Sequence, residues 1–227
     1  MRQINIKKCI RFLTVVACSS TAYAGSVVDL APGDFTDTLS GITNTQMPEL
    51  IGATLNDSLQ DFSIWSQGEG RVESPLYQGT LMTRIVRSFE TGNLTFNYRL
   101  LNPNPELMGA ISHIEVSGYE GLQTRVEYRN EVTAPGDEGP SIASRSEDGD
   151  MLSFDFDGML DVEEESRFFF AMVDSPDWHA DAATVTIYLQ SGESVSLTVA
   201  GANPAIPTPG TLGLLGIAGL ISVRRRR

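Results

Sequence analysis

Apolar and polar residues alternate along much of this chain, and the clearest alternation covers residues 94–100. Leu, Phe, Tyr and Leu occupy every second position there, and Thr, Asn and Arg occupy the positions between them. Because successive side chains of a β-strand point to opposite faces, this spacing places the apolar residues on one face and the polar residues on the other. We therefore expect a central, half-buried strand at 94–100.

Several other stretches have the apolar content and the short length of strands, and clusters of Gly, Pro, Asp, Asn and Ser separate them. No stretch of about ten residues has helical periodicity. About nine or ten short strands with such punctuation predict a single all-β domain, an antiparallel β-sandwich or jelly roll. The further strands are expected at 80–89, 111–116, 122–128, 151–156, 167–173, 183–189 and 195–199. Turns or loops are expected at 67–70, 90–93, 102–105, 134–139, 157–158, 175–177 and 191–193.

The first part of this domain is less regular. Residues 25–47 are rich in small and polar residues and predict one short strand followed by a loop. Residues 50–64 predict two short strands around the turn-forming triplet Asn56-Asp57-Ser58. A helix that begins at Pro48 is the competing interpretation, because proline is favoured at the first position of a helix.

The C-terminal residues form three consecutive parts with different physical properties. Pro207-Thr208-Pro209-Gly210 cannot continue a helix or a central strand, because proline lacks the amide donor and glycine is flexible. Residues 211–223 carry no charge and are rich in Leu, Ile and Gly. The cluster Arg224, Arg225, Arg226 and Arg227 follows, and the positive-inside rule keeps such a cluster in the cytoplasm. The preceding domain is then expected on the outer side of the membrane.

The apolar stretch is short for a permanent anchor. Its thirteen residues form about 20 Å of helix at about 1.5 Å per residue, whereas the hydrocarbon core is about 30 Å thick. A short apolar tail behind a break of small residues is the layout of a signal that is held in the membrane and then cut. A short permanent transmembrane anchor is the alternative interpretation.

Together these three parts resemble the PEP-CTERM sorting signal of Gram-negative bacteria. The resemblance implies a sorting tail at 205–227, with Pro207, Thr208, Pro209 and Gly210 as a variant of the Pro-Glu-Pro motif. It also implies processing by an exosortase-type membrane protease and release to the cell surface or the exopolysaccharide matrix. Residues 80–174 are in addition similar to a group of PEP-CTERM proteins of unknown function, through the stretches 84–96, 136–140 and 166–170. That second resemblance implies a fold and a destination but no activity.

The N-terminal residues have the pattern of a secretory signal peptide. Residues 1–8 are basic, residues 12–18 are apolar, and Ala22-Tyr23-Ala24 matches the small-x-small site of signal peptidase. We expect a signal peptide at 1–24, export through the Sec pathway, and cleavage after Ala24. A lipobox at 15–18, with a lipidated Cys18, is the alternative. Cleavage after Ala24 removes both cysteines, Cys9 and Cys18, so the predicted domain at 25–204 has no disulfide.

Charge separates this domain from its flanking segments. The basic residues of the leader and the tail leave a body with eight arginines, no lysine and all 29 acidic residues, a formal charge of −21. Such a surface repels nucleic acid and anionic lipid, and it favours solubility. It also attracts divalent cations. We therefore expect no nucleic-acid partner.

One acidic cluster is a candidate Ca²⁺ site. Carboxylate oxygens at short spacing are the ligands that Ca²⁺ prefers, but the cluster lacks the ligand spacing of an EF-hand loop. A strand with Phe154 and Phe156 inside and its acids in water explains the same alternation, and the prediction is no metal site. The acids of this cluster are Asp148, Asp150, Asp155, Asp157 and Asp161, followed by Glu163, Glu164 and Glu165.

Catalytic motifs are weak in this sequence. His113 and His179 lie far apart, and no nucleophile elbow, zinc-protease motif or phosphate-binding glycine loop occurs. Glu120 and Glu127 could serve as the two carboxylates of a glycosidase, but the many acids of the chain make that pairing unspecific. No motif indicates a cofactor. The sequence therefore predicts no enzyme.

Exposed aromatic side chains on jelly-roll modules can stack on sugars. The candidates are Trp65, Tyr77, Tyr119 and Trp178, and for each of them a place in the core is the simpler reading. Trp178 follows Pro176 and is the one expected to be most exposed.

These observations predict a non-enzymatic protein that crosses the inner membrane and reaches the cell surface or the extracellular matrix, with a structural or adhesive role. A carbohydrate- or Ca²⁺-binding module of the matrix is the alternative, and a glycan hydrolase on the same fold comes third. The expected partners are the export machinery, the exosortase-type protease, the membrane through the tail, and extracellular polysaccharide.

Overall fold

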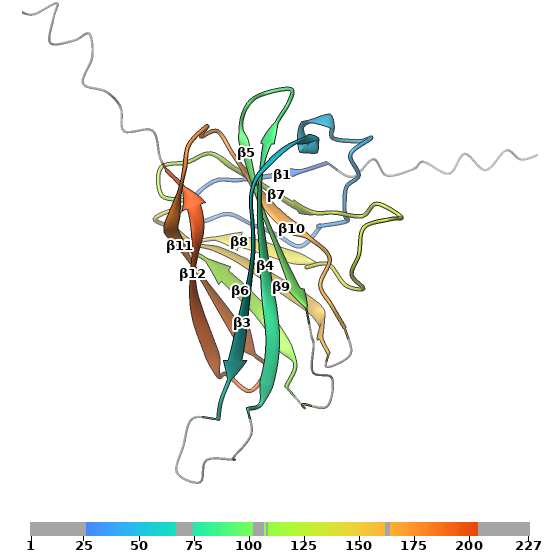
Figure 1. The fold of residues 1–227 in the computed structure, drawn as a ribbon, viewed down its shortest axis with the longest axis vertical. Coiled ribbons are helices and arrows are strands. Elements are labelled where there is room, and N and C mark those ends of the chain that lie inside the picture. The colour runs from blue at the N-terminus through green and yellow to red at the C-terminus, as the bar shows by residue number, and fades with distance from the viewer. Residues whose placement is uncertain (1–25, 67–74, 102–106, 108, 162–163, 204–227) are drawn as a thin grey trace, which may run out of the picture.

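The computed structural model describes residues 26–66, 75–101, 107, 109–161 and 164–203, which form an all-β body (Figure 1). The predicted signal peptide, the sorting tail, and the turns at 67–70 and 102–105 lie outside the described residues. The elements are β1 (Val28–Leu30), β2 (Phe35–Thr36), the 3-10 helix η1 (Pro48–Leu50), β3 (Gly52–Ile64), β4 (Tyr77–Ser88), β5 (Leu94–Leu101), β6 (Ile111–Val116), β7 (Thr124–Tyr128), β8 (Ile142–Arg145), β9 (Leu152–Leu160), β10 (Phe169–Val173), β11 (Trp178–Leu189) and β12 (Ser194–Ala202).

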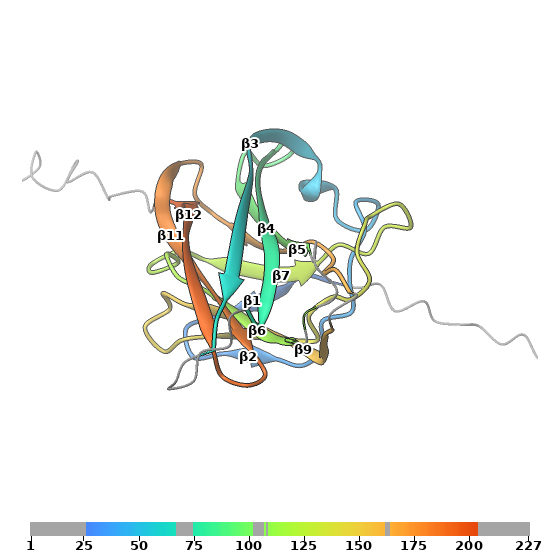
Figure 2. The ribbon, with the colours of Figure 1, turned by 60° about the horizontal axis from the view of Figure 1, so that its bottom comes forward.

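The strands form two antiparallel sheets. Sheet A has the order β1-β7-β10-β5-β4-β3, and sheet B has the order β12-β11-β6-β9-β8-β2. The predicted class, an all-β fold of two antiparallel sheets, is confirmed. Figures 1 and 2 show the edge strands β3 and β12 side by side, and Gln60 Nε2 on β3 donates a hydrogen bond to the Thr198 carbonyl on β12 over 3.1 Å.

The main core lies between the sheets and centres on an aromatic cluster. The Phe169 ring of sheet A lies 4.9 Å from the Phe154 ring of sheet B, 5.8 Å from Tyr98 and 5.9 Å from Phe156. All four side chains are buried. Tilted and edge-on aromatic pairs add to the stability gained from burial alone, so this cluster fixes the two sheets against each other. Phe154 and Phe156 point inward as predicted.

Strand β5 is central, as predicted, but it is buried on both faces. Its polar residues Thr95, Asn97 and Arg99 have exposed fractions of only 2%, 4% and 9%. On the outer face of sheet A, Ile42 and Leu50 pack on Phe170 and Met172 of the neighbouring strand β10, and Arg99 donates hydrogen bonds to Ser166 and Glu165. Alternation in the sequence shows which residues share a face of a strand. It does not show which other segments of the chain cover that face.

The predicted turn at Asn56-Asp57-Ser58 is wrong, because β3 runs through these residues as one strand. Cross-strand pairing overrides the turn preference: Asp57 lies opposite Arg84 of β4, and their side chains form an ion pair of 2.7 Å. A bulge between Thr54 and Asn56 interrupts the register. The competing helix at Pro48 is present only as the single 3-10 turn η1.

The other strand predictions agree with the structure within a few residues, with three differences. Strand β8 was not predicted, and β9 continues through the expected turn at 157–158 to Leu160. Strand β11 begins at Trp178, earlier than expected. Turns are present at 90–93, 175–177 and 191–193.

Arg145 at the end of β8 is a buried hub with an exposed fraction of 5%. Its guanidinium uses all five N–H donors. Nε donates to the Gly149 carbonyl, and the two Nη groups donate to backbone carbonyls of Leu30, Tyr119 and Leu122 and to the Thr124 hydroxyl. Burial lowers the pKa of Arg145 from its ordinary value. This one side chain therefore links β1, β7, β8 and the loop after β6.

Candidate functional site

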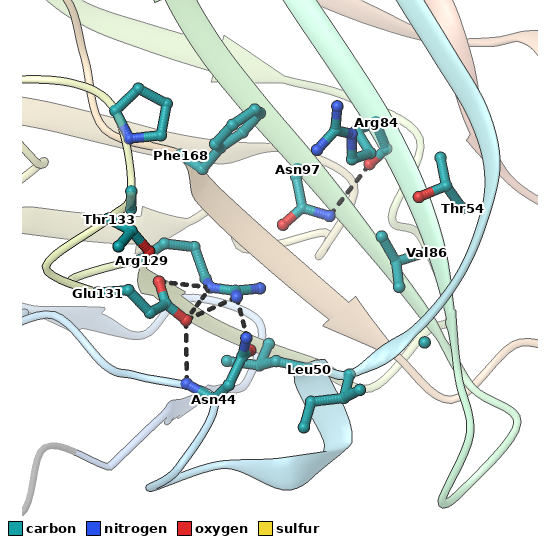
Figure 3. Close-up of a pocket in the computed structure, with 14 residues that line it drawn as sticks. Asn44, Leu50, Thr54, Arg84, Val86, Asn97, Arg129, Glu131, Thr133 and Phe168 are labelled. Carbon is teal, nitrogen blue, oxygen red and sulfur yellow. Dashed lines mark hydrogen bonds and ion pairs between the residues drawn. The ribbon is translucent and has the colours of Figure 1, made fainter.

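The outer face of sheet A carries an open groove of about 360 Å³, which we call the outer-face groove (Figure 3). Its floor comes from β3, β4, β5 and Phe168, one wall from the segment around η1, and the other wall from the loop that follows β7. The lining residues are Asn44, Leu50, Ile51, Gly52, Thr54, Arg84, Val86, Asn97, Arg129, Glu131, Thr133, Ala134, Pro135 and Phe168.

The bulge in β3 helps to build the floor. Thr54 pairs with Val86 before the bulge, and Asn56 pairs with Ile85 after it. Both Thr54 and Val86 line the groove, whereas Ile85 packs in the core between the sheets. The extra residue shifts the alternation of β3, so that beyond the bulge Asp57 lies opposite Arg84 on the groove side and Asn56 lies opposite the core residue Ile85.

Arg84 and Asn97 lie opposite each other on β4 and β5 and form the polar part of the floor. Asn97 Nδ2 donates to the backbone carbonyls of Arg84, over 3.1 Å, and Thr95, over 3.2 Å. Both amide hydrogens are thereby used. Its Oδ1 has no hydrogen-bond partner among the described residues, and Figure 3 shows this oxygen turned away from the Arg84 carbonyl.

The Arg84 guanidinium is only partly used by the protein. One Nη group pairs with Asp57, and Nε is buried and has no hydrogen-bond partner among the described residues, which leaves the second Nη group as the donor for a ligand. The guanidinium carbon lies 5.4 Å from the centre of the Phe168 ring, and that of Arg99 lies 5.8 Å from the same ring. These cation–π contacts hold Phe168 beside the floor.

Arg129 and Glu131 fix the wall that follows β7. Arg129 Nε lies 2.9 Å and 3.1 Å from the two Glu131 oxygens, and one Nη donates to Glu131 over 2.6 Å. The same Nη contacts the Asn44 oxygen over 2.5 Å, and the Asn44 amide donates to Glu131 over 3.0 Å. Burial by itself raises the pKa of Glu131, but the hydrogen bonds and charge of Arg129 bring the pKa below its ordinary value. The two walls are thus joined to each other.

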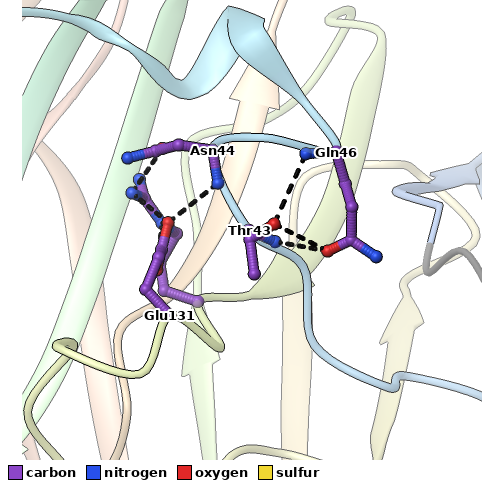
Figure 4. A network of polar contacts seen from close by, with 5 residues as sticks. Thr43, Asn44, Gln46 and Glu131 are labelled. Carbon is purple, nitrogen blue, oxygen red and sulfur yellow. Dashed lines mark hydrogen bonds and ion pairs between the residues drawn. The ribbon is translucent and has the colours of Figure 1, made fainter.

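A reciprocal pair of hydrogen bonds shapes the segment before η1 (Figure 4). The Gln46 side-chain oxygen accepts from the Thr43 amide and hydroxyl, both over 2.9 Å, and the Gln46 amide donates back to the Thr43 hydroxyl over 3.4 Å. This is the capping-box arrangement of Thr-x-x-Gln, here in a turn. It holds Asn44 in place for Glu131.

The ion pairs found within the described residues all lie at this face. Each joins an arginine of sheet A, or of its margin, to an acid on a neighbouring strand or on a segment that covers the sheet. A groove whose walls are fixed in this way needs little reordering when a ligand binds. The pairs are Arg84–Asp57, Arg99–Glu165, Arg125–Glu49 and Arg129–Glu131.

The predicted acidic cluster is spread over a turn and a strand. Asp148 accepts from the Ser146 hydroxyl and the Asp150 amide, and Asp150 accepts from the Gly118 amide. Asp155 lies opposite His113 on the neighbouring strand. In the described ranges no group of three or more His, Cys, Asp or Glu side chains is placed to hold a metal ion.

The catalytic candidates do not meet in one cleft. The His113 ring stacks on Tyr188 of sheet B with centres 4.3 Å apart, and His179 is exposed on β11. Glu120 is exposed in a loop. Glu127 is fully buried and accepts backbone N–H bonds from Ser40, Gly41 and Tyr128. Burial raises the pKa of Glu127, and these three bonds oppose the rise.

Two of the four aromatic candidates lie in the core, which was the simpler reading, and Trp178, which was expected to be the most exposed, is not. Tyr77 and Tyr119 belong to the core, and Trp178 is partly buried against it. Trp65 is the most exposed of the four, with an exposed fraction of 49%. The expectation for Trp178 was wrong because this residue begins β11 instead of lying in the preceding turn.

No protein family model, no curated protein and no solved structure matches this chain. Within the part of the chain that the structure describes, no helix has the length and apolar character needed to cross a bilayer. The residues of the predicted sorting motif, arginine cluster and signal peptidase site lie outside that part. The class that the fold defines is therefore an all-β protein of two antiparallel sheets with a preformed groove on one outer face.

The sequence did not identify the groove residues as a site. Arg84 and Asn97 were assigned to strands, and their pairing across β4 and β5 follows from a hairpin that was predicted at 90–93. The Thr43-x-x-Gln46 pattern was a readable local signal. The contacts between Asn44 and Glu131 join segments that are far apart in the chain, and no local sequence pattern predicts them.

Proposed function

We propose that this protein is an exported, non-enzymatic component of the cell surface or extracellular matrix, which attaches to extracellular polysaccharide through the outer-face groove. The observation that carries the proposal is the groove itself. Amide, hydroxyl and guanidinium groups line a preformed, open surface, and they border on the apolar side chains of Leu50, Val86 and Phe168. Such a mixture suits hydroxyl-rich sugars, which offer both hydrogen-bonding groups and apolar ring faces.

The predicted terminal signals support the destination. In this proposal a signal peptide at 1–24 directs export, and a PEP-CTERM-like tail at 205–227 holds the chain at the inner membrane until an exosortase-type protease releases it. A short transmembrane helix within the tail and a jelly-roll-like arrangement of the two sheets are parts of the same proposal. The strongly acidic body suits an extracellular protein that must stay soluble.

Blocking the groove tests the binding part of the proposal. Thr54 is exposed on β3 and lines the groove, so Thr54→Trp places a large ring over the floor. Leu59→Trp on the same strand is the matched control, because Leu59 is exposed and lies outside the groove. We expect Thr54→Trp to abolish retention on insoluble extracellular polysaccharide in a pull-down and Leu59→Trp to leave it unchanged. Equal retention of both variants would remove the groove from the proposal.

Mapping the termini of the mature protein tests the sorting part. Intact-mass measurement is expected to show a chain that begins at Gly25 and ends near Pro207. A chain that retains Arg227 in the inner membrane would instead indicate a permanent anchor, and a cytosolic chain with both termini intact would contradict export altogether.

A further inference from the structure

We infer that the outer-face groove selects a sugar unit that bears a carboxylate, with the carboxylate on Arg84 and a neighbouring hydroxyl on Asn97. This inference rests on the proposed polysaccharide binding and adds the class of sugar. It follows from which hydrogen-bonding groups of the groove the protein itself leaves unused.

Asn97 supplies an acceptor that the protein does not use. The residue has an exposed fraction of 4%, and its amide hydrogens are already bound to two backbone carbonyls. These two bonds fix which end of the carboxamide faces the groove (Figure 3). Since Oδ1 has no partner within the described residues, it is available to accept a hydrogen bond from a ligand, and a sugar hydroxyl is such a donor.

Arg84 supplies a charged donor beside this acceptor. Its pair with Asp57 lies near the surface, with side chains 35% and 42% exposed, and uses one of its two Nη groups. A carboxylate is the planar anion that matches a guanidinium. Because Arg84 and Asn97 are cross-strand partners, their Cβ atoms lie about 5 Å apart on the same face of the sheet, so one sugar unit can contact both side chains.

The other lining residues of the groove do not repel an anion. Glu131 is the one acidic residue among the lining residues of the described chain, and Arg129 and Asn44 already occupy its oxygens. The remaining polar lining groups, such as the hydroxyls of Thr54 and Thr133, can donate. Together with the Arg84 guanidinium, these hydroxyl donors can bind the negative charge of a carboxylate, which a neutral hydroxymethyl group does not carry.

The negative charge of the acidic body is expected to change the rate at which an anionic polymer associates more than it changes the hydrogen bonds at the groove floor. A formal charge of −21 on the body repels an anionic polymer at long range. At physiological ionic strength such repulsion is screened beyond about 8 Å, whereas a hydrogen-bonded pair at the floor is screened much less. Association with a carboxylated polymer should therefore become faster as salt rises from about 0.01 M to about 0.15 M, which is opposite to the usual behaviour of oppositely charged partners.

Calorimetry with two matched polymers tests the inference. The full chain is titrated with a polyglucuronate oligosaccharide and with the same oligosaccharide after its carboxyl groups are reduced to alcohols. We expect the carboxylated form to bind at least about tenfold more tightly, and Arg84→Met to remove this preference. Arg87→Met is the matched control, because Arg87 lies on the same strand outside the groove and donates to the Pro176 carbonyl over 2.8 Å.

The possible outcomes separate the inference from the proposed function. Equal affinity for both polymers, or an equal loss for both in Arg84→Met, overturns the carboxylate preference and leaves polysaccharide binding standing. Failure of both polymers and of native matrix polysaccharide to bind overturns the two together. Thermal melting of each variant shows whether a loss of binding comes from unfolding.

Discussion

Arg145 and Arg84 show how one residue type serves two different regions of this molecule. Between the sheets, Arg145 gives all five of its N–H donors to the protein, and it joins four segments of chain. On the outer face of sheet A, Arg84 pairs with Asp57 through one Nη group, its buried Nε has no partner within the described residues, and its second Nη group remains for a ligand. The comparison teaches that the donors used by the protein itself, and not the residue type, separate a structural arginine from a binding one.

The largest effect on stability is expected when the buried Arg145 side chain is replaced. Arg145→Met removes five hydrogen bonds and leaves the Gly149 and Leu122 carbonyls without this donor, whereas Leu30 and Tyr119 keep a second one, so we expect the free energy of unfolding to fall by about 3–5 kcal/mol. Arg84→Met removes a surface ion pair and the cation–π contact with Phe168, and should cost only about 1–2 kcal/mol. Urea denaturation of both variants measures the difference. Similar losses for the two would end the distinction drawn between these arginines.

A smaller effect is expected at the wall of the groove. Glu131→Gln removes the charge that holds Arg129 and Asn44, so we expect about 1 kcal/mol lower stability and several-fold weaker polysaccharide binding. Glu115→Gln is the control on the outer face of sheet B, where Glu115 accepts a hydrogen bond from the Tyr188 hydroxyl over 2.7 Å. Titration calorimetry should find weaker binding only for Glu131→Gln. Weaker binding in both variants would mean that the wall has no special role.

The smallest effect is a difference in pH dependence between two carboxylates. The pKa of Glu127 is raised from its ordinary value of 4.5, so its ionisation opposes folding and its contribution to stability falls as pH rises above that value. The pKa of Glu131 is lowered, so its contribution is full above 4.5 and is lost as pH falls below it. Replacing each by Gln should therefore change the slope of stability against pH in opposite directions.

Denaturation of the two variants and the parent chain between about pH 3 and pH 7 measures these slopes. Relative to the parent, Glu127→Gln should gain stability as pH rises, and Glu131→Gln should lose it. Slopes of the same sign for both variants would contradict the conclusion that burial raises the pKa of Glu127 and that at Glu131 the contacts with Arg129 outweigh burial.

The sequence predicted the fold class because period-two alternation and turn residues are local signals. The strand at 94–100 was found from alternation alone, and most other strands lie within a few residues of their predicted ranges. The turn at Asn56-Asp57-Ser58 failed because the Asp57–Arg84 pair and the long ladder with β4 outweigh local preference. Burial of both faces of β5 could not be predicted, because it depends on segments that are distant in the chain, such as those that carry Ile42, Leu50 and Ser166.

The site was less predictable than the fold for the same physical reason. Asn97 is informative only because its two amide hydrogens are bound to backbone and its oxygen is not, and that division appears only in three dimensions. The exposed aromatic was assigned to Trp178 instead of Trp65, because the start of β11 was placed too late. A binding site whose groups come from paired strands and distant loops cannot be recognised from any one stretch of sequence.

Chemical-shift mapping of the ¹⁵N-labelled full chain tests the central claim most directly. On addition of the polyglucuronate oligosaccharide, the account predicts that shift changes gather at the groove, in residues 44–54, 84–86, 97 and 129–135. Changes that gather instead around His113 and Tyr188 on the outer face of sheet B, or no changes with any matrix polysaccharide, would contradict it.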